Sequence, residues 1–197
     1  MTSQPDRAPV YGPVHKVHRY ALSAALQQLG ATDFANPAEA TTAVAVVRQQ
    51  LAFSAEHLHH EDRHVHPMVR TIGNKQFLEL EAAHGDHRRE FDALGRLADR
   101  IEGADTAERV RLGSELYLAF ARFMARDFEH MDFEERVIEP LLHARYSDEQ
   151  ITRLHLDVIA ETPAEELEAL GDLAAKALSK PEQEAVRLLF EGASAAA

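Results

Sequence analysis

Apolar residues recur at intervals of three and four along most of the chain, which is the spacing of one buried face of an α-helix. Alternating runs of β-branched residues, which would indicate strands, are nearly absent. The pattern predicts four long helices, over residues 14–30, 36–70, 76–102 and 105–139. Because only short connections separate them, we expect antiparallel neighbours and an all-α, up-down-up-down four-helix bundle.

Residues that start and stop helices agree with these limits. Asn36-Pro37-Ala38-Glu39 supplies an N-cap, a proline in the first turn and an acidic third residue, and Asp105 begins a capping-box-like string. Pro140 is expected to end the fourth helix. Glycines stand near the ends of the other three: Gly30, Gly73 and Gly103.

The end of the chain has shorter elements. Three capping-box strings occur there: Ser147-Asp148-Glu149-Gln150, Thr162-Pro163-Ala164-Glu165 and Ser179-Lys180-Pro181-Glu182. They predict three short helices over residues 148–161, 163–178 and 180–191. We therefore expect a flexible N-terminus over residues 1–13, a bundle over 14–142 and a helical extension packed on the bundle over 143–197.

Histidine interrupts the apolar face of every long helix. Burying an unpartnered polar group costs roughly 2–7 kcal/mol, and burying a charge costs far more. Imidazole and carboxylate are both ligands for divalent cations, so metal ions are the predicted partners. The interrupted faces read His15, His18, Leu22 in the first helix, then Leu51, Ser54, His57 (or Leu58), Glu61, then Leu80, His84, His87, Phe91, and finally Phe123, Asp127, His130, Glu134.

Two His-x-x-x-Glu pairs stand out, His57 with Glu61 and His130 with Glu134. The spacing alone carries little weight, since chance produces such pairs in a chain this rich in both residues. Both pairs, however, fall on the inward face of their own helix, one turn apart. His59 and His66 point away from that face, and we expect them in solvent.

The order of these motifs resembles the hemerythrin-like domain over about residues 14–142. The strings HLHHED and HMDFEERVIEP carry the resemblance, together with the histidines of the first and third helices. It implies a non-haem di-iron centre with oxo or hydroxo and carboxylate bridges, in which Glu61 and Glu134 bridge the two irons. The implied ligands are His15, His57, Glu61, His84 and/or His87, His130 and Glu134.

The chain departs from the family pattern in several places. Oxygen-carrying members have His-x-x-x-His on the third helix, whereas His84 and His87 are three residues apart here. His18 is an alternative to His15, and Glu135 is an alternative to Glu134. The three C-terminal helices resemble an extension found in some bacterial hemerythrin-like proteins, where they could cap the bundle, gate the site or form a homodimer interface.

Composition narrows the type of metal site. The chain has no cysteine, which excludes disulfides and thiolate ligands. Five or so histidines and two carboxylates exceed the four ligands of a closed structural zinc site and suit two ions of iron or manganese. The formal charge of −12 argues against a nucleic-acid partner. No run is long and apolar enough for a membrane span, so a cytoplasmic location is the default expectation.

These features favour binding of O₂, or of NO or peroxide, for sensing, storage or scavenging. A di-iron oxidase or a catalase/peroxidase-like enzyme is the alternative, and iron handling or a structural metal-binding bundle is a second alternative. Histidine-rich ligation leaves the iron pair less negative, which favours reversible binding or peroxide chemistry over oxidation of strong C–H bonds. The sequence identifies no redox partner.

Overall fold

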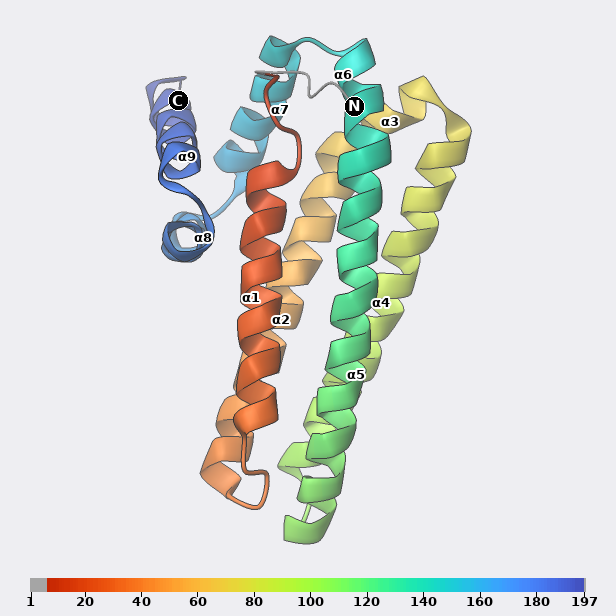
Figure 1. The fold of residues 1–197 in the computed structure, drawn as a ribbon, viewed down its shortest axis with the longest axis vertical. Helices are drawn as coiled ribbons and strands as arrows, with labels where there is room; N and C mark the ends of the chain where they lie inside the picture. The colour runs from red at the N-terminus through yellow and green to blue at the C-terminus, as the bar shows by residue number, and fades with distance from the viewer. Residues whose placement is uncertain (1–6, 197) are drawn as a thin grey trace. The chain divides into compact units, whose positions relative to one another are not determined.

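A computed structural model describes residues 7–196, with side chains to residue 192, and the backbone in that range is helical without a strand. The predicted all-α fold is therefore confirmed. The predicted flexibility of residues 1–6 lies outside the described residues. Along the chain (Figure 1) the elements are α1 (Gly12–Ala31), α2 (Pro37–His60), η1 (Glu61–Val65), α3 (His66–Ile72), α4 (Asn74–Glu102), α5 (Thr106–Phe133), η2 (Glu134–Ile138), α6 (Glu139–Arg145), α7 (Asp148–Glu161), α8 (Ala164–Ala177) and α9 (Lys180–Ala196).

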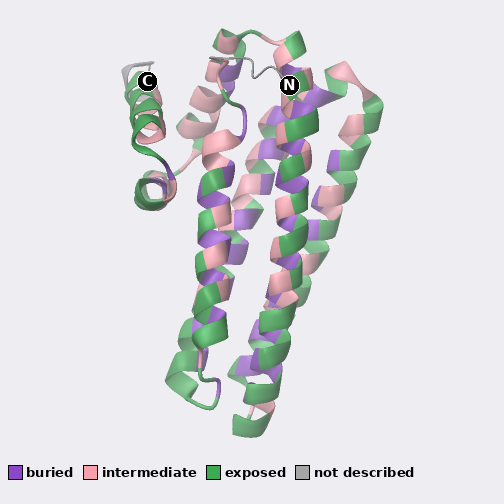
Figure 2. Ribbon diagram, in the orientation of Figure 1, coloured by how far each residue is buried: buried purple, intermediate pink, exposed green. Residues whose placement is uncertain are grey.

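Most predicted helix starts are confirmed by the hydrogen bonds at the caps. Asn36 Oδ1 accepts from the backbone N–H of Ala38 at 3.0 Å, and Asp105 Oδ1 accepts from the backbone N–H of Glu108 at 3.0 Å. Ser147 and Gln150 form the complete reciprocal capping box at the start of α7. Buried and exposed residues alternate along each long helix (Figure 2), as an amphipathic pattern requires.

The predicted capping box at Thr162 is wrong. Helix α8 begins at Ala164 without a side-chain cap. The Thr162 hydroxyl instead donates to the carbonyl of Val158, one turn back at the end of α7. A threonine hydroxyl can serve the helix on either side of it, and here the preceding helix uses it.

Two π-helical turns interrupt the helices predicted over residues 36–70 and 105–139. In η1 the N–H of His66 donates to Glu61 O, and in η2 the N–H of Glu139 donates to Glu134 O, each across five residues. Proline lacks an N–H and its ring crowds the carbonyl four residues earlier, and a widened turn accommodates it. Pro67 and Pro140 each stand six residues after the first residue of their turn.

The expectation that Pro140 ends the fourth helix is therefore wrong. The helical path continues through η2 and α6 as far as Arg145. The π-helical turn absorbs the missing hydrogen bond, so the chain does not have to leave the helix at the proline. The same reasoning explains why α3 follows η1 without a loop.

One compact unit comprises residues 21–59 and 78–130. Its core is aliphatic and aromatic, and the rings of Phe91 and Phe120 both pack edge-on against Phe123. The Arg109 side chain stabilises the turn before α2, because it donates hydrogen bonds to the carbonyls of Phe34 and Ala35 at 2.8 and 2.9 Å. A β-carbon at position 113 would overlap the buried ring of Phe34, so glycine is required there.

The other compact unit comprises residues up to 20, 60–77 and 131 onwards. Within it η1 packs on α3 and α7, η2 packs on α6, and α7 packs on α9. Tyr146 donates from its hydroxyl to the carbonyl of Met68 at 3.2 Å, which joins the end of α6 to α3. None of the helices in the described residues has the length and apolar composition of a membrane span.

Candidate metal centre

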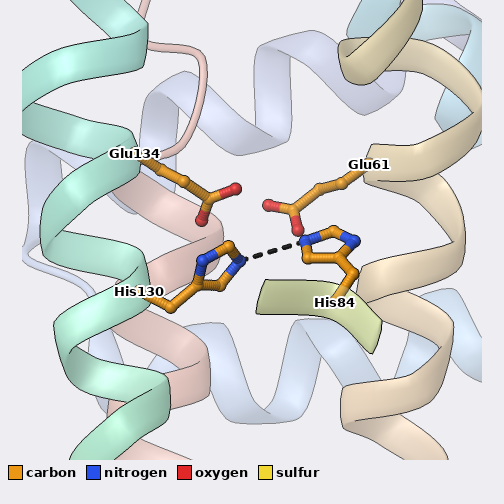
Figure 3. Close-up of side chains that lie close together, drawn as sticks. All are labelled: Glu61, His84, His130 and Glu134. Carbon is orange, nitrogen blue, oxygen red and sulfur yellow. Dashed lines mark hydrogen bonds between the residues drawn. The ribbon is translucent and has the colours of Figure 1, made fainter. Parts of the chain in front are cut away.

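The first cluster of predicted ligands surrounds His15 on α1. Its Nε2 lies 3.4 Å from Glu61 Oε1 and 3.5 Å from Glu134 Oε2. His15 and Glu134 are fully buried, and Glu61 is only 3% exposed. Figure 3 shows the carboxylates of Glu61 and Glu134 pointing toward each other from their separate helices. One imidazole nitrogen and two carboxylate oxygens thus meet in the interior.

The two π-helical turns place these carboxylates. Glu61 is the first residue of η1 and Glu134 is the first residue of η2. Each follows a histidine by four residues on a continuous helical path, so His57 and His130 stand one turn before the two glutamates. Widened turns of this kind occur often at functional sites, because the local break in pattern re-aims a side chain.

Glu135 and Arg19 support the opposite edge of the His15 ring. His15 Nδ1 lies 2.9 Å from Glu135 Oε1, and the same oxygen accepts from Arg19 at 2.6 Å. Burial by itself lowers the pKa of His15, but hydrogen bonds and charges of Glu135 and Glu61 outweigh it and raise that pKa. Burial raises the pKa of Glu135, yet His15 and Arg19 bring it down to about 2. Glu135 therefore orients the ring so that Nε2 faces the other two carboxylates.

The second cluster joins α4 and α5. The Nε2 atoms of His84 and His130 lie 3.0 Å apart, as the dashed line in Figure 3 marks. The ring centroid of His87 lies 5.1 Å from that of His130. All three histidines are buried. Two imidazole nitrogens that close together can share one proton, and they can also bind one cation.

Three groups of residues within the described part of the chain have the composition of a metal site. In each group, one ligand-forming atom per residue lies within 4.8 Å of those of the other members. The groups are Glu61, His84, His130 and Glu134 (Figure 3); His15, His57 and Glu61; and Asp62, His66 and His84.

The distances fit a transition-metal ion. Nitrogen and oxygen ligands lie about 2.0–2.2 Å from such an ion, so neighbouring ligands are separated by about 3 to 3.5 Å. The distances from His15 to Glu61 and Glu134, and from His84 to His130, fall in or close to that range. Imidazole and carboxylate donors together suit a divalent transition-metal ion. The described residues are consistent with this type of ion.

The other sequence-predicted residues take different positions. His57 is half-buried, whereas His18 is buried on the same helix as His15. His59 is exposed, as expected. The expectation that His66 faces solvent is wrong, since it is 1% exposed and lies 3.2 Å from Asp62. The extra residue of η1 rotates the following helix, which turns His66 inward.

The sequence analysis missed Tyr11, and it placed Asp127 on the inward face without giving it a role. Tyr11 stacks on His15 with ring centroids 5.0 Å apart, and Asp127 lies 3.8 Å from His87. A signal for each was present, because Tyr11 continues the His15 face by four residues and Asp127 stands on the face of His130. No family model, curated protein or solved structure matches this chain.

Proposed function

We propose that this chain is a hemerythrin-like four-helix bundle whose non-haem di-iron centre binds O₂, or NO or peroxide. The observation that carries the proposal is the buried meeting of His15 with Glu61 and Glu134, at 3.4 and 3.5 Å. Two carboxylates buried beside a histidine would only destabilise a core that served packing alone. A divalent cation would offset the cost of burying the two carboxylate charges, and neutral imidazoles would complete its coordination.

The proposed ligands are the histidines and glutamates of the two clusters. Glu61 and Glu134 would hold the ions through their carboxylate oxygens, because both groups are buried and each offers two oxygens. The histidines would fill the remaining positions. When bound, the iron pair would supply electrons and an open coordination position for the small ligand. The proposed set is His15, His57, Glu61, His84, His87, His130 and Glu134.

Residues beside the ligands would control their orientation and the access of water. Glu135, itself held by Arg19, would keep the Nε2 of His15 directed at the carboxylates of Glu61 and Glu134. Phe123 packs edge-on against His87 at 5.9 Å and is 1% exposed. An apolar wall of this kind excludes water, which protects a reactive ligand from protonation and loss.

Metal analysis followed by oxygen exposure tests this proposal. Purified protein without a tag is expected to hold two iron ions per chain, because histidines and carboxylates that project into a bundle core can hold a pair of ions. The anaerobic ferrous form is then exposed to air in a spectrophotometer. A stable visible band that disappears under vacuum is expected for reversible binding. Rapid conversion to a featureless diferric spectrum would favour the oxidase or peroxidase alternative.

Paired glutamine variants connect the metal to the proposed ligands. Glu134→Gln keeps the side-chain volume and removes the charge, so we expect it to lose most of the iron. Glu129→Gln changes an exposed glutamate on the same helical path and should keep the iron. A single zinc ion in the parent protein, or no metal with an intact fold, would contradict the di-iron proposal.

A further inference from the structure

Tyr11 places a phenol hydroxyl inside the protein beside the first cluster. The residue is 1% exposed, and its hydroxyl has no hydrogen-bond partner among the described residues. A buried hydroxyl that donates to nothing destabilises the fold, whereas phenylalanine would fill almost the same volume without that cost. The hydroxyl therefore indicates an acceptor that the described residues do not supply.

The surroundings of Tyr11 are those of the proposed metal centre. Its ring stacks on His15 at an interplanar angle of 24°. Burial raises the pKa of Tyr11, and the nearby charges of Glu134, Glu61 and Glu139 raise it further. The phenol O–H at this position is a hydrogen-bond donor directed into the buried surroundings of the first cluster.

Hydrogen bonds from several other parts of the chain hold the segment that carries Tyr11. Residues 7–11 form this segment, which we call the strap. The Val10 N–H donates to the Glu139 carboxylate at 2.8 Å. The His143 ring donates to the carbonyl of Ala8 at 3.0 Å. The His155 ring donates to the carbonyl of Pro9 at 2.8 Å. The Tyr11 carbonyl accepts from the His15 N–H at 3.0 Å, and Arg7 pairs with Asp148 at 2.5 Å. The extension helix α7 thereby helps to fix the position of Tyr11.

We infer that the Tyr11 hydroxyl donates a hydrogen bond to the small ligand held at the metal centre. This inference rests on the proposed function, because the ligand it describes is the one bound there. The stacking on His15 and the bonds to the strap restrict the ring, so the hydroxyl is pre-positioned before the ligand arrives. Tyr11 is then a ligand-binding residue, and α7 contributes to binding by holding the strap.

Azide is the probe for the experiment, with Tyr11→Phe as the test variant and Tyr20→Phe as the matched control at an exposed position. Iron content is measured first in all three proteins, followed by azide affinity and the infrared band of bound azide in H₂O and D₂O. Loss of a hydrogen bond to a charged ligand should weaken azide binding about tenfold or more in Tyr11→Phe. The band should shift between H₂O and D₂O in the parent protein and the control but not in Tyr11→Phe.

The denaturant midpoint of the metal-free proteins gives a second measurement. If the hydroxyl serves only the ligand, metal-free Tyr11→Phe should unfold at the same or a higher denaturant concentration than the parent. A lower midpoint would mean that the hydroxyl has a structural partner and would overturn the inference. An unchanged azide affinity and isotope shift in iron-loaded Tyr11→Phe would also overturn it. If the parent protein holds no iron, the proposed function itself has failed.

Discussion

His87 lies near two carboxylates on the Nδ1 side of its ring. Its Nδ1 lies 3.7 Å from Glu90 and 3.8 Å from Asp127, and Asp127 is only 4% exposed. A carboxylate on this side of a metal-binding histidine can orient its ring and raise its basicity as a ligand. Asp127 is thus a candidate for orienting His87.

Asp127→Asn tests this role at the scale of one residue. The variant keeps the side-chain shape and removes the charge, so we expect metal affinity to fall about 10–100-fold while the fold is retained. Titration against a competing chelator measures the affinity. Asp132→Asn, at an exposed position paired with Arg136 on the same helical path, is the control. Equal affinities in the two variants would assign Asp127 a structural role only.

At the scale of elements, the two π-helical turns fix the direction of the residues that follow them. Each residue of a regular helix advances by about 100°, so an extra residue in one turn rotates everything after it by that amount. His66 is buried for this reason. Glu61 and Glu134 stand at the first position of each turn, where the change of phase begins.

The contact between α7 and the strap predicts a pH dependence of stability. Burial lowers the pKa of His155 from 6.5, although the bond to the Pro9 carbonyl and the charge of Glu139 partly oppose the shift. The unfolded chain therefore binds this proton at a higher pH than the folded chain. The contribution of His155 is complete above pH 6.5 and is lost as the pH falls below that value.

His155→Gln isolates this contribution, because the glutamine amide can donate to Pro9 but does not titrate in this range. The free energy of unfolding should depend less on pH below 6.5 in this variant than in the parent protein. Urea unfolding at a series of pH values measures the difference. The control is His59→Gln at an exposed position. A parallel pH profile for His155→Gln and the parent would contradict the assignment.

At the scale of the whole molecule, metal binding and folding are linked. The proposed ligands come from α1, α2, η1, α4, α5 and η2, and an unfolded chain does not hold them together. Ions that bind only the folded state stabilise it by mass action. The formal charge of −12 also makes added cations electrostatically favourable.

Removing the metal should therefore lower stability by a predictable amount. With free ferrous ion at a hundred times its dissociation constant, the free energy of unfolding should rise by about 2.7 kcal/mol for one site. Anaerobic thermal unfolding with and without a chelator measures this change. Glu134→Gln should show little difference between the two conditions. An equal effect of iron on the parent and on Glu134→Gln would place the binding elsewhere.

The sequence alone determined the helices and the residue types on their inward faces. Periodicity and capping are local properties, so the limits of α4 and the cap of α7 could be predicted from neighbours a few residues away. The burial of His15, His84 and His130 followed from the same periodicity.

Only the tertiary structure decided the features that depend on residues far apart in the chain. Tyr11 is buried on His15 because residues of α6 and α7 hold the strap, more than a hundred positions away. His66 faces inward because a proline changes the helical phase, and the Thr162 hydroxyl bonds backward to α7. Spacing along one helix shows which face is apolar, but it does not show which distant side chain or altered turn completes that face, because packing selects those partners.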